Sequence, residues 1–117
     1  MTVTNDVFKY VTTTEMNGIL TGNQTCIAKI NDGYWSSLNI GDTVSFIDGV
    51  TDKCIIKVCS INYTANFGDA WFLYNENLFP ETNFTSRNEA NIHFKKLYRD
   101  SDVATYGVII INFVICK

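Results

Sequence analysis

Six segments of the chain show the alternating or continuously apolar pattern that is typical of β-strands. The two longest, residues 53–63 and 106–115, are nearly continuous in apolar residues and rich in Ile and Val. Such strands are buried on both faces or belong to a strongly curved sheet. The four shorter segments are residues 7–11, 25–30, 43–47 and 71–74. The pattern therefore predicts a fold that consists mainly of β-strands.

Two pairs of residues have the spacing of a helix-capping box, in which a hydroxyl and a carboxylate each accept an otherwise unpaired backbone N–H. The pairs are Thr12 with Glu15 and Ser86 with Glu89. The first helix is expected to end at Gly22, which suits a left-handed C-terminal cap. Because strands outnumber helices, we expect an α+β protein. It would form a small β-barrel or curved sheet of about five or six strands, with two short helices packed on its openings.

Three polar segments between these elements are expected to be loops or turns. Residues 31–39 contain an Asp-Gly turn signal and carry two aromatic side chains, Tyr34 and Trp35. Residues 75–84 contain the only proline, Pro80, and residues 100–102 form a turn. Aromatic residues in a polar loop are good candidates for contact with a ligand.

The composition fits one folded domain with few nonspecific interactions with nucleic acid. Of 117 residues, 46% are hydrophobic and 14% aromatic, and no repeat or linker divides them. We therefore expect a single domain over residues 1–117. The net charge of −3 argues against a protein that coats DNA, since nonspecific affinity is mostly electrostatic. Any binding of nucleic acid would need a local basic patch or base stacking.

Two further features of the sequence indicate where in the cell the protein is located. The longest apolar run, residues 107–116, is interrupted by Asn112 and is too short to cross a bilayer. The first ten residues have neither a basic segment before an apolar run nor a small-residue cleavage site, so no signal peptide is expected. The sequence therefore favours a cytoplasmic protein without a membrane partner.

The cysteines are consistent with a reducing compartment. They form no C-x-x-C pair, and the odd spacing from Cys54 to Cys59 would point the two side chains to opposite faces of a strand. We expect buried, reduced thiols, with no metal site, no cofactor and no disulfide-linked partner. The four residues are Cys26, Cys54, Cys59 and Cys116.

Three segments give the chain a resemblance to the ASCH domain, a branch of the PUA-like β-barrel superfamily. The first is a helix ending in ILTG and followed by a strand, and the second is the NIGDTVSF turn and strand. The third is a helix ending in FKKLY, followed by a YGVIIINF strand. The segments occur in the order and spacing of the family over most of the chain. The resemblance implies a PUA-like β-barrel.

The resemblance also implies a pocket between barrel and helices that accepts RNA or a nucleoside. Some members of the family look like amidohydrolases acting on N4-acetylcytidine, and others have been proposed as ribonucleases. Aligned on Gly22, the family lysine falls on Gln24 and the family Thr or Glu on Ile27, while Lys29 keeps a positive charge. Glutamine cannot serve as a general base and isoleucine cannot be a nucleophile. A slip of one residue would bring Thr25 into the site instead.

The candidate site residues follow from this comparison. Gln24, Thr25 and Lys29 are expected to make polar contacts with the nucleotide. Trp35 is expected to stack on a base, and His93 or Tyr98 to lie at the edge of the pocket. Glu89 is the nearest candidate for the distant acid of the family, although its place in a capping box explains it without chemistry. Glu89 also lies four residues before His93, a spacing that would let it orient the ring.

The sequence therefore predicts a domain that binds RNA or a modified nucleoside and lacks the amidase lysine. One alternative is a nucleoside amidohydrolase or ribonuclease with a rearranged site, in which Thr25, Lys29 and Glu89 would be the weak catalytic candidates. Another is a viral or phage domain that binds a protein partner. Binding without catalysis is the preferred hypothesis because the motif lysine is absent.

Overall fold

The fold is known from a computed structural model that describes residues 8–50, 52–74 and 84–116. Its described strands are β1 (Phe8–Tyr10), β2 (Cys26–Ile30), β3 (Thr43–Ile47), β4 (Lys53–Thr64) and β5 (Val108–Ile115). The described helices are α1 (Thr13–Thr21), α2 (Gly33–Ser36), α3 (Phe67–Tyr74), α4 (Arg87–Lys95) and α5 (Asp100–Tyr106). Of the loop predicted over residues 75–84, only Phe84 lies within the described residues; Pro80 does not.

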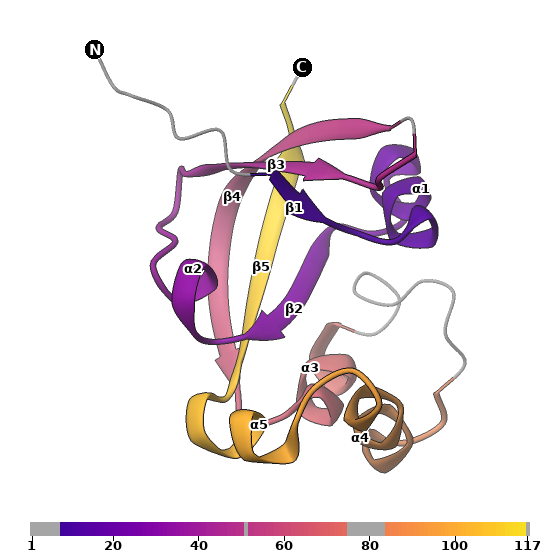
Figure 1. The fold of residues 1–117 in the computed structure, drawn as a ribbon, viewed down its shortest axis with the longest axis vertical. Helices are drawn as coiled ribbons and strands as arrows, with labels where there is room; N and C mark the ends of the chain where they lie inside the picture. The colour runs from indigo at the N-terminus through magenta and orange to yellow at the C-terminus, as the bar shows by residue number, and fades with distance from the viewer. Residues whose placement is uncertain (1–7, 51, 75–83, 117) are drawn as a thin grey trace.

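The strands form one curved sheet in the order β1-β3-β4-β5-β2. All neighbouring strands are antiparallel except β1 and β3, which run parallel. Figure 1 shows the sheet curling so that its two edge strands, β1 and β2, approach each other on the side of α1. The predicted α+β class, with a curved sheet of five strands, is confirmed.

Both faces of the sheet carry a hydrophobic core. The core on the concave face includes Val44, Phe46 and Ile56 and is closed by Met16 and Ile19 of α1. The core on the other face joins the sheet to α3, α4 and α5, which lie together in Figure 1. Strand β5 contributes to both cores, since its successive side chains point to opposite faces. Its near-continuous apolar sequence, noted above, follows from this double burial.

Helix α1 begins and ends as its sequence predicts. The Thr12 hydroxyl accepts the Glu15 N–H at 3.0 Å, and the Glu15 carboxylate accepts the Thr12 N–H at 3.1 Å. Gly22 ends the helix with φ = 84°, in the left-handed region that glycine favours. In α4 the Ser86 hydroxyl accepts the Glu89 N–H at 3.1 Å, but the Glu89 carboxylate reaches one residue further back, to Thr85.

The prediction of a strand over residues 71–74 is wrong, because this segment is the second half of α3. Short apolar runs suit a buried strand or a buried helix equally well. Here Phe67, Ala70 and Tyr74 recur at helical spacing and pack into the second core. Asn66 supplies the N-terminal cap, since its side-chain oxygen accepts the Asp69 N–H at 2.9 Å. The chain therefore has five described helices rather than two.

Two other predicted loops contain short helices. The loop over residues 31–39 includes α2, and the turn at residues 100–102 is the first turn of α5. Asp100 and Asp102 lie where a helix dipole favours acidic side chains, which explains why this segment continues as a helix. Among the residues that the structure describes, no helix has the length and apolarity needed to cross a lipid bilayer.

The cysteines fall into two classes. Cys26 and Cys54 are buried in the two cores, as predicted, whereas Cys59 and Cys116 are exposed. Cys59 lies at an irregularity in β4, where the pairing with β5 shifts between Val58 and Ser60. Its exposure continues the alternation of β4, in which residues 53, 55 and 57 are exposed and residues 54, 56 and 58 are buried. The prediction of buried thiols is therefore wrong for Cys59 and Cys116.

Candidate functional site

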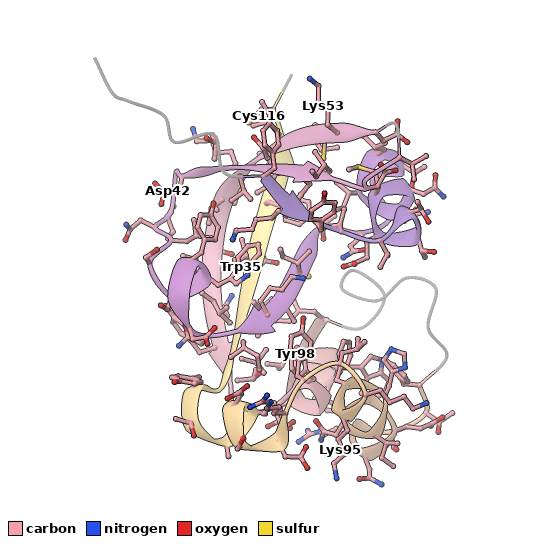
Figure 2. All side chains as sticks on the ribbon, in the orientation of Figure 1. Trp35, Asp42, Lys53, Lys95, Tyr98 and Cys116 are labelled. Atoms are coloured by element: carbon pink, nitrogen blue, oxygen red, sulfur yellow. The ribbon has the colours of Figure 1, made fainter. Side chains whose placement is uncertain are left out.

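A cavity of about 350 Å³ opens where β2, α2 and α5 meet. It brings together three of the residues singled out from the sequence: Lys29, Trp35 and Tyr98. The remaining lining residues are Ile30, Asp32 and Asp102. Figure 2 shows Trp35 beside β2 and Tyr98 at the helical end of the molecule. These three residues are far apart in sequence, so the fold itself assembles the cavity.

The turn after β2 positions Lys29 and Trp35. The Asp32 N–H donates to the Ile30 carbonyl at 2.8 Å, and Gly33 has φ = 50°, which allows the chain to turn directly into α2. The Lys29 Nζ lies 5.8 Å from the centre of the Trp35 ring. This distance is within the range of a cation–π interaction. Lys29 is half-buried, so its aliphatic stem packs while its ammonium group reaches the ring.

A second lysine approaches the same aromatic pair from β1. The Lys9 Nζ lies 4.3 Å from the centre of the Tyr34 ring and 5.9 Å from that of Trp35. Tyr34 and Trp35 meet edge to face with centres 5.2 Å apart. Burial, together with the nearby carboxylate of Asp42, raises the pKa of Tyr34. Trp35 is therefore flanked by two lysines, of which Lys9 was not a site candidate on sequence grounds.

Tyr98 forms the helical wall of the cavity. Its ring stacks on Phe67 with centres 4.9 Å apart, and its N–H donates to the Phe94 carbonyl at 2.9 Å. Burial raises the pKa of Tyr98, and the negative charge of Glu15 raises it further. The phenol therefore stays protonated at neutral pH and can donate a hydrogen bond.

Two carboxylates in the cavity were not foreseen. Asp32 precedes α2, and Asp102 lies in the first turn of α5, where an acidic residue is sufficiently explained by helix formation. With Lys29 they give the cavity one positive and two negative groups. The cavity thus offers aromatic faces, hydrogen-bond donors and acceptors, and a slightly negative charge. This combination suits a planar, polar and uncharged ligand better than a phosphate group.

Two other candidates on the first motif lie away from this cavity. Gln24 is only 4% exposed, and its Nε2 group donates to the Cys26 carbonyl at 3.1 Å. It fixes the junction between α1 and β2, because its N–H also donates to the Gly18 carbonyl at 2.9 Å. Thr25 is exposed and lies four residues before Lys29. Along an extended strand that separation is about 13 Å, too far for both side chains to contact one small ligand.

The two candidates on α4 also lie elsewhere. The Glu89 carboxylate accepts hydrogen bonds from the N–H and the hydroxyl of Thr85, and these bonds lower the pKa of Glu89. The expected orientation of His93 by Glu89 is not among the described hydrogen bonds. His93 is exposed, and its ring lies against Phe84 and Phe94, with centres 5.3 Å and 5.0 Å away.

No protein-family model matches the sequence, and no curated protein matches it. Two solved structures are similar to nearly the whole chain. The crystal structure of hypothetical protein PH0355 has a TM-score of 0.81 at 19% sequence identity, covering 93% of this chain and 97% of that one. The solution NMR structure of protein PF0455 from Pyrococcus furiosus has a TM-score of 0.73 at 18% identity, covering 94% and 96%. At these identities the similarity shows the fold alone.

Proposed function

We propose that this chain is an ASCH-like, PUA-like domain that binds a modified nucleoside, or one nucleoside unit of an RNA, in the cavity between β2, α2 and α5. The observation that carries the proposal is the presence of Lys29, Trp35 and Tyr98 around a single cavity. All three were candidate nucleotide-binding residues on sequence grounds. Together they supply ring faces, a positive charge and a neutral hydroxyl donor.

The aromatic residues would supply most of the affinity. A nucleobase has a planar face, and stacking on an aromatic side chain contributes about 1–3 kcal/mol per base. Trp35 is only partly buried, so part of its ring is accessible to a ligand. The Lys29 ammonium near the ring would bind a carbonyl oxygen of the base, and the Tyr98 hydroxyl would donate to another acceptor.

The charge of the cavity favours a nucleoside over a nucleotide within it. Asp32 and Asp102 would repel a phosphate group, whereas their oxygens can accept hydrogen bonds from an amino group or from sugar hydroxyls. In an RNA, the phosphates would have to lie outside the cavity, on the side where Lys9 flanks Tyr34 and Trp35.

The arrangement favours binding without catalysis. Gln24 is occupied by its hydrogen bond to Cys26, and Ile27 is buried at the position of the family Thr or Glu. The three weak catalytic candidates do not converge, since Thr25 is distant from Lys29 along β2 and Glu89 is bound to Thr85.

A variant with one tryptophan would test the proposal directly. Trp71→Phe leaves Trp35 as the sole indole and preserves the aromatic contact with Phe84. We expect the fluorescence of this variant to change on addition of cytidine, N4-acetylcytidine or a short single-stranded RNA. Amide NMR shifts should cluster around Lys29, Trp35 and Tyr98.

Matched tryptophan substitutions provide the control. Trp35→Leu should weaken binding about tenfold or more, as expected for loss of one stacking contact, whereas Trp71→Leu should not. Binding would be followed by amide shifts, since Trp35→Leu removes its own fluorophore. No shifts at millimolar ligand would overturn the proposal and favour a protein partner. Release of acetate from N4-acetylcytidine would instead show that the domain is an enzyme.

A further inference from the structure

A second cavity, of about 390 Å³, lies between α3, α4 and α5. Tyr98 lines it as well as the first cavity. Its wall also includes side-chain amides and aromatic rings: Asn66, Asn88, Asn91, Phe67 and Phe94. None of these five residues was a site candidate on sequence grounds.

Two of the amides are held in a fixed orientation by the start of α3. The Asn66 Oδ1 accepts the Asp69 N–H at 2.9 Å, and the Asn91 Oδ1 accepts the Gly68 N–H at 2.8 Å. Because a backbone N–H needs an acceptor, each amide presents its oxygen to the start of α3. The Asn91 Nδ2 lies beside Gly68. Within the described part of the chain, neither Nδ2 group donates a hydrogen bond. Both residues line the cavity, and the Nδ2 group of each has hydrogen-bonding capacity left.

The same cavity presents an aromatic surface. Phe67 and Phe94 stack with centres 4.5 Å apart and planes 17° from parallel, and Tyr98 stacks on Phe67. Such rings bind a planar ligand by stacking. The two charged groups in the lining, Lys95 and Asp100, pair with each other at 3.7 Å and are largely exposed. They give the cavity no net charge.

We propose that this second cavity binds a small, uncharged, planar ligand that carries carbonyl oxygens, of the kind represented by uracil. The donor groups of Asn66 and Asn91 bind its carbonyl oxygens, and the rings of Phe94 and Tyr98 contact its face. The inference is independent of the proposed nucleoside site, because the groups that select the ligand here are amide donors rather than Lys29, Asp32 and Asp102.

The test is an amide NMR titration of the whole chain with uracil. We expect shifts in residues 66–68 and 88–95, separate from any shifts around Lys29 and Trp35. Dihydrouracil, which keeps both carbonyl groups but lacks a planar ring, should bind more weakly. Shifts confined to the first cavity, or none at millimolar uracil, would overturn the proposal while leaving the nucleoside site to be judged separately.

A double variant tests the role of the amides without disturbing α3. Asn66→Asp with Asn91→Asp keeps an oxygen for each backbone N–H of α3 but replaces both donors by acceptors. Uracil affinity should fall at least about tenfold, because two hydrogen bonds are lost. The control is Asn17→Asp with Asn62→Asp, which makes the same charge change at two exposed positions and should leave the affinity unchanged.

A second variant keeps the test decisive if the Asp substitutions disturb folding. Ala104 lies on α5, lines the second cavity and is exposed, so Ala104→Trp should fill the space without burying the new ring in a core. This variant should also lose the uracil shifts around residues 88–95. Unchanged uracil affinity in a folded Asn66→Asp, Asn91→Asp protein, or in Ala104→Trp, would refute the proposed site.

Discussion

At the scale of single residues, Gln24 shows how a candidate binding residue can have a structural role instead. Its amide could have read the edge of a base, but it is buried and donates to the Cys26 carbonyl. Cys26 itself is fully buried in the core between the sheet and helices α3 to α5. Burial raises the pKa of the Cys26 thiol from its ordinary value of 9.0 to about 12.

This shift makes the free energy of unfolding depend on alkaline pH. The unfolded chain loses the thiol proton above about pH 9, whereas the folded chain holds it until about pH 12. Unfolding therefore becomes easier as the pH rises through this window, and the contribution is fully present below pH 9. Urea denaturation of Cys26→Ala from about pH 8, roughly one unit below the start of the window, to about pH 11, roughly one unit below its end, should show a shallower decline in stability than the unsubstituted protein. Equal slopes would contradict the assignment.

At the scale of helices and strands, the sequence predicts best those elements that are determined by residues close together in the chain. Helix α1 and its caps, strand β2 and the turn between Lys29 and Trp35 all depend on residues close together in the chain. Helix α3 was assigned to the wrong class because its decisive contacts are with α4, which lies far along the chain. The Asn66 cap was a usable local signal that would have favoured a helix.

The contact between α3 and α4 leads to a prediction at Gly68. A Cβ atom there would lie 2.4 Å from the Arg87 carbonyl oxygen and 2.6 Å from the Asn91 Nδ2. Exchanging a helical glycine for alanine normally stabilises a helix by up to about 1 kcal/mol. Here the two helices would have to separate, so Gly68→Ala should lower the free energy of unfolding by about 1–3 kcal/mol. Thermal denaturation is the measurement, and a raised midpoint would show that the helices can move apart freely.

At the scale of the whole molecule, β5 joins the two halves. It pairs with β4 on one side and β2 on the other, and residues Val108–Ile111 have no exposed surface. The second cavity lies among α3, α4 and α5. The first lies at the edge strand β2, between Trp35, which packs against the concave core, and Tyr98, which packs against the core on the other face. Lys29, Trp35 and Tyr98 could be selected from the sequence, but their meeting could not be derived from it. Asp32 and Asp102 were missed because the sequence placed them in an Asp-Gly turn and in a turn at residues 100–102, where an acidic side chain is ordinary.

The sheet should open from its edges inward. Native-state hydrogen exchange measured by NMR should be slowest in β5, whose backbone is bonded on both sides and covered on both faces. It should be much faster in β1, an edge strand of three residues. Comparable protection of the β1 and β5 amides would mean that the sheet opens as one unit rather than from its edges.

Because β5 contributes to two cores, its successive side chains belong alternately to one core and to the other. Ile109, Ile111 and Phe113 belong to the concave core, and Val108 and Ile110 to the helical one. Exchange of one branched aliphatic residue for another leaves this alternation intact. Insertion of a single residue before Asn112 would move every following side chain of the strand to the opposite face of the sheet. Asn112 would then take the place of Phe113 in the concave core. Strand β5 should therefore tolerate the exchange of one aliphatic side chain for another far better than a change in its length.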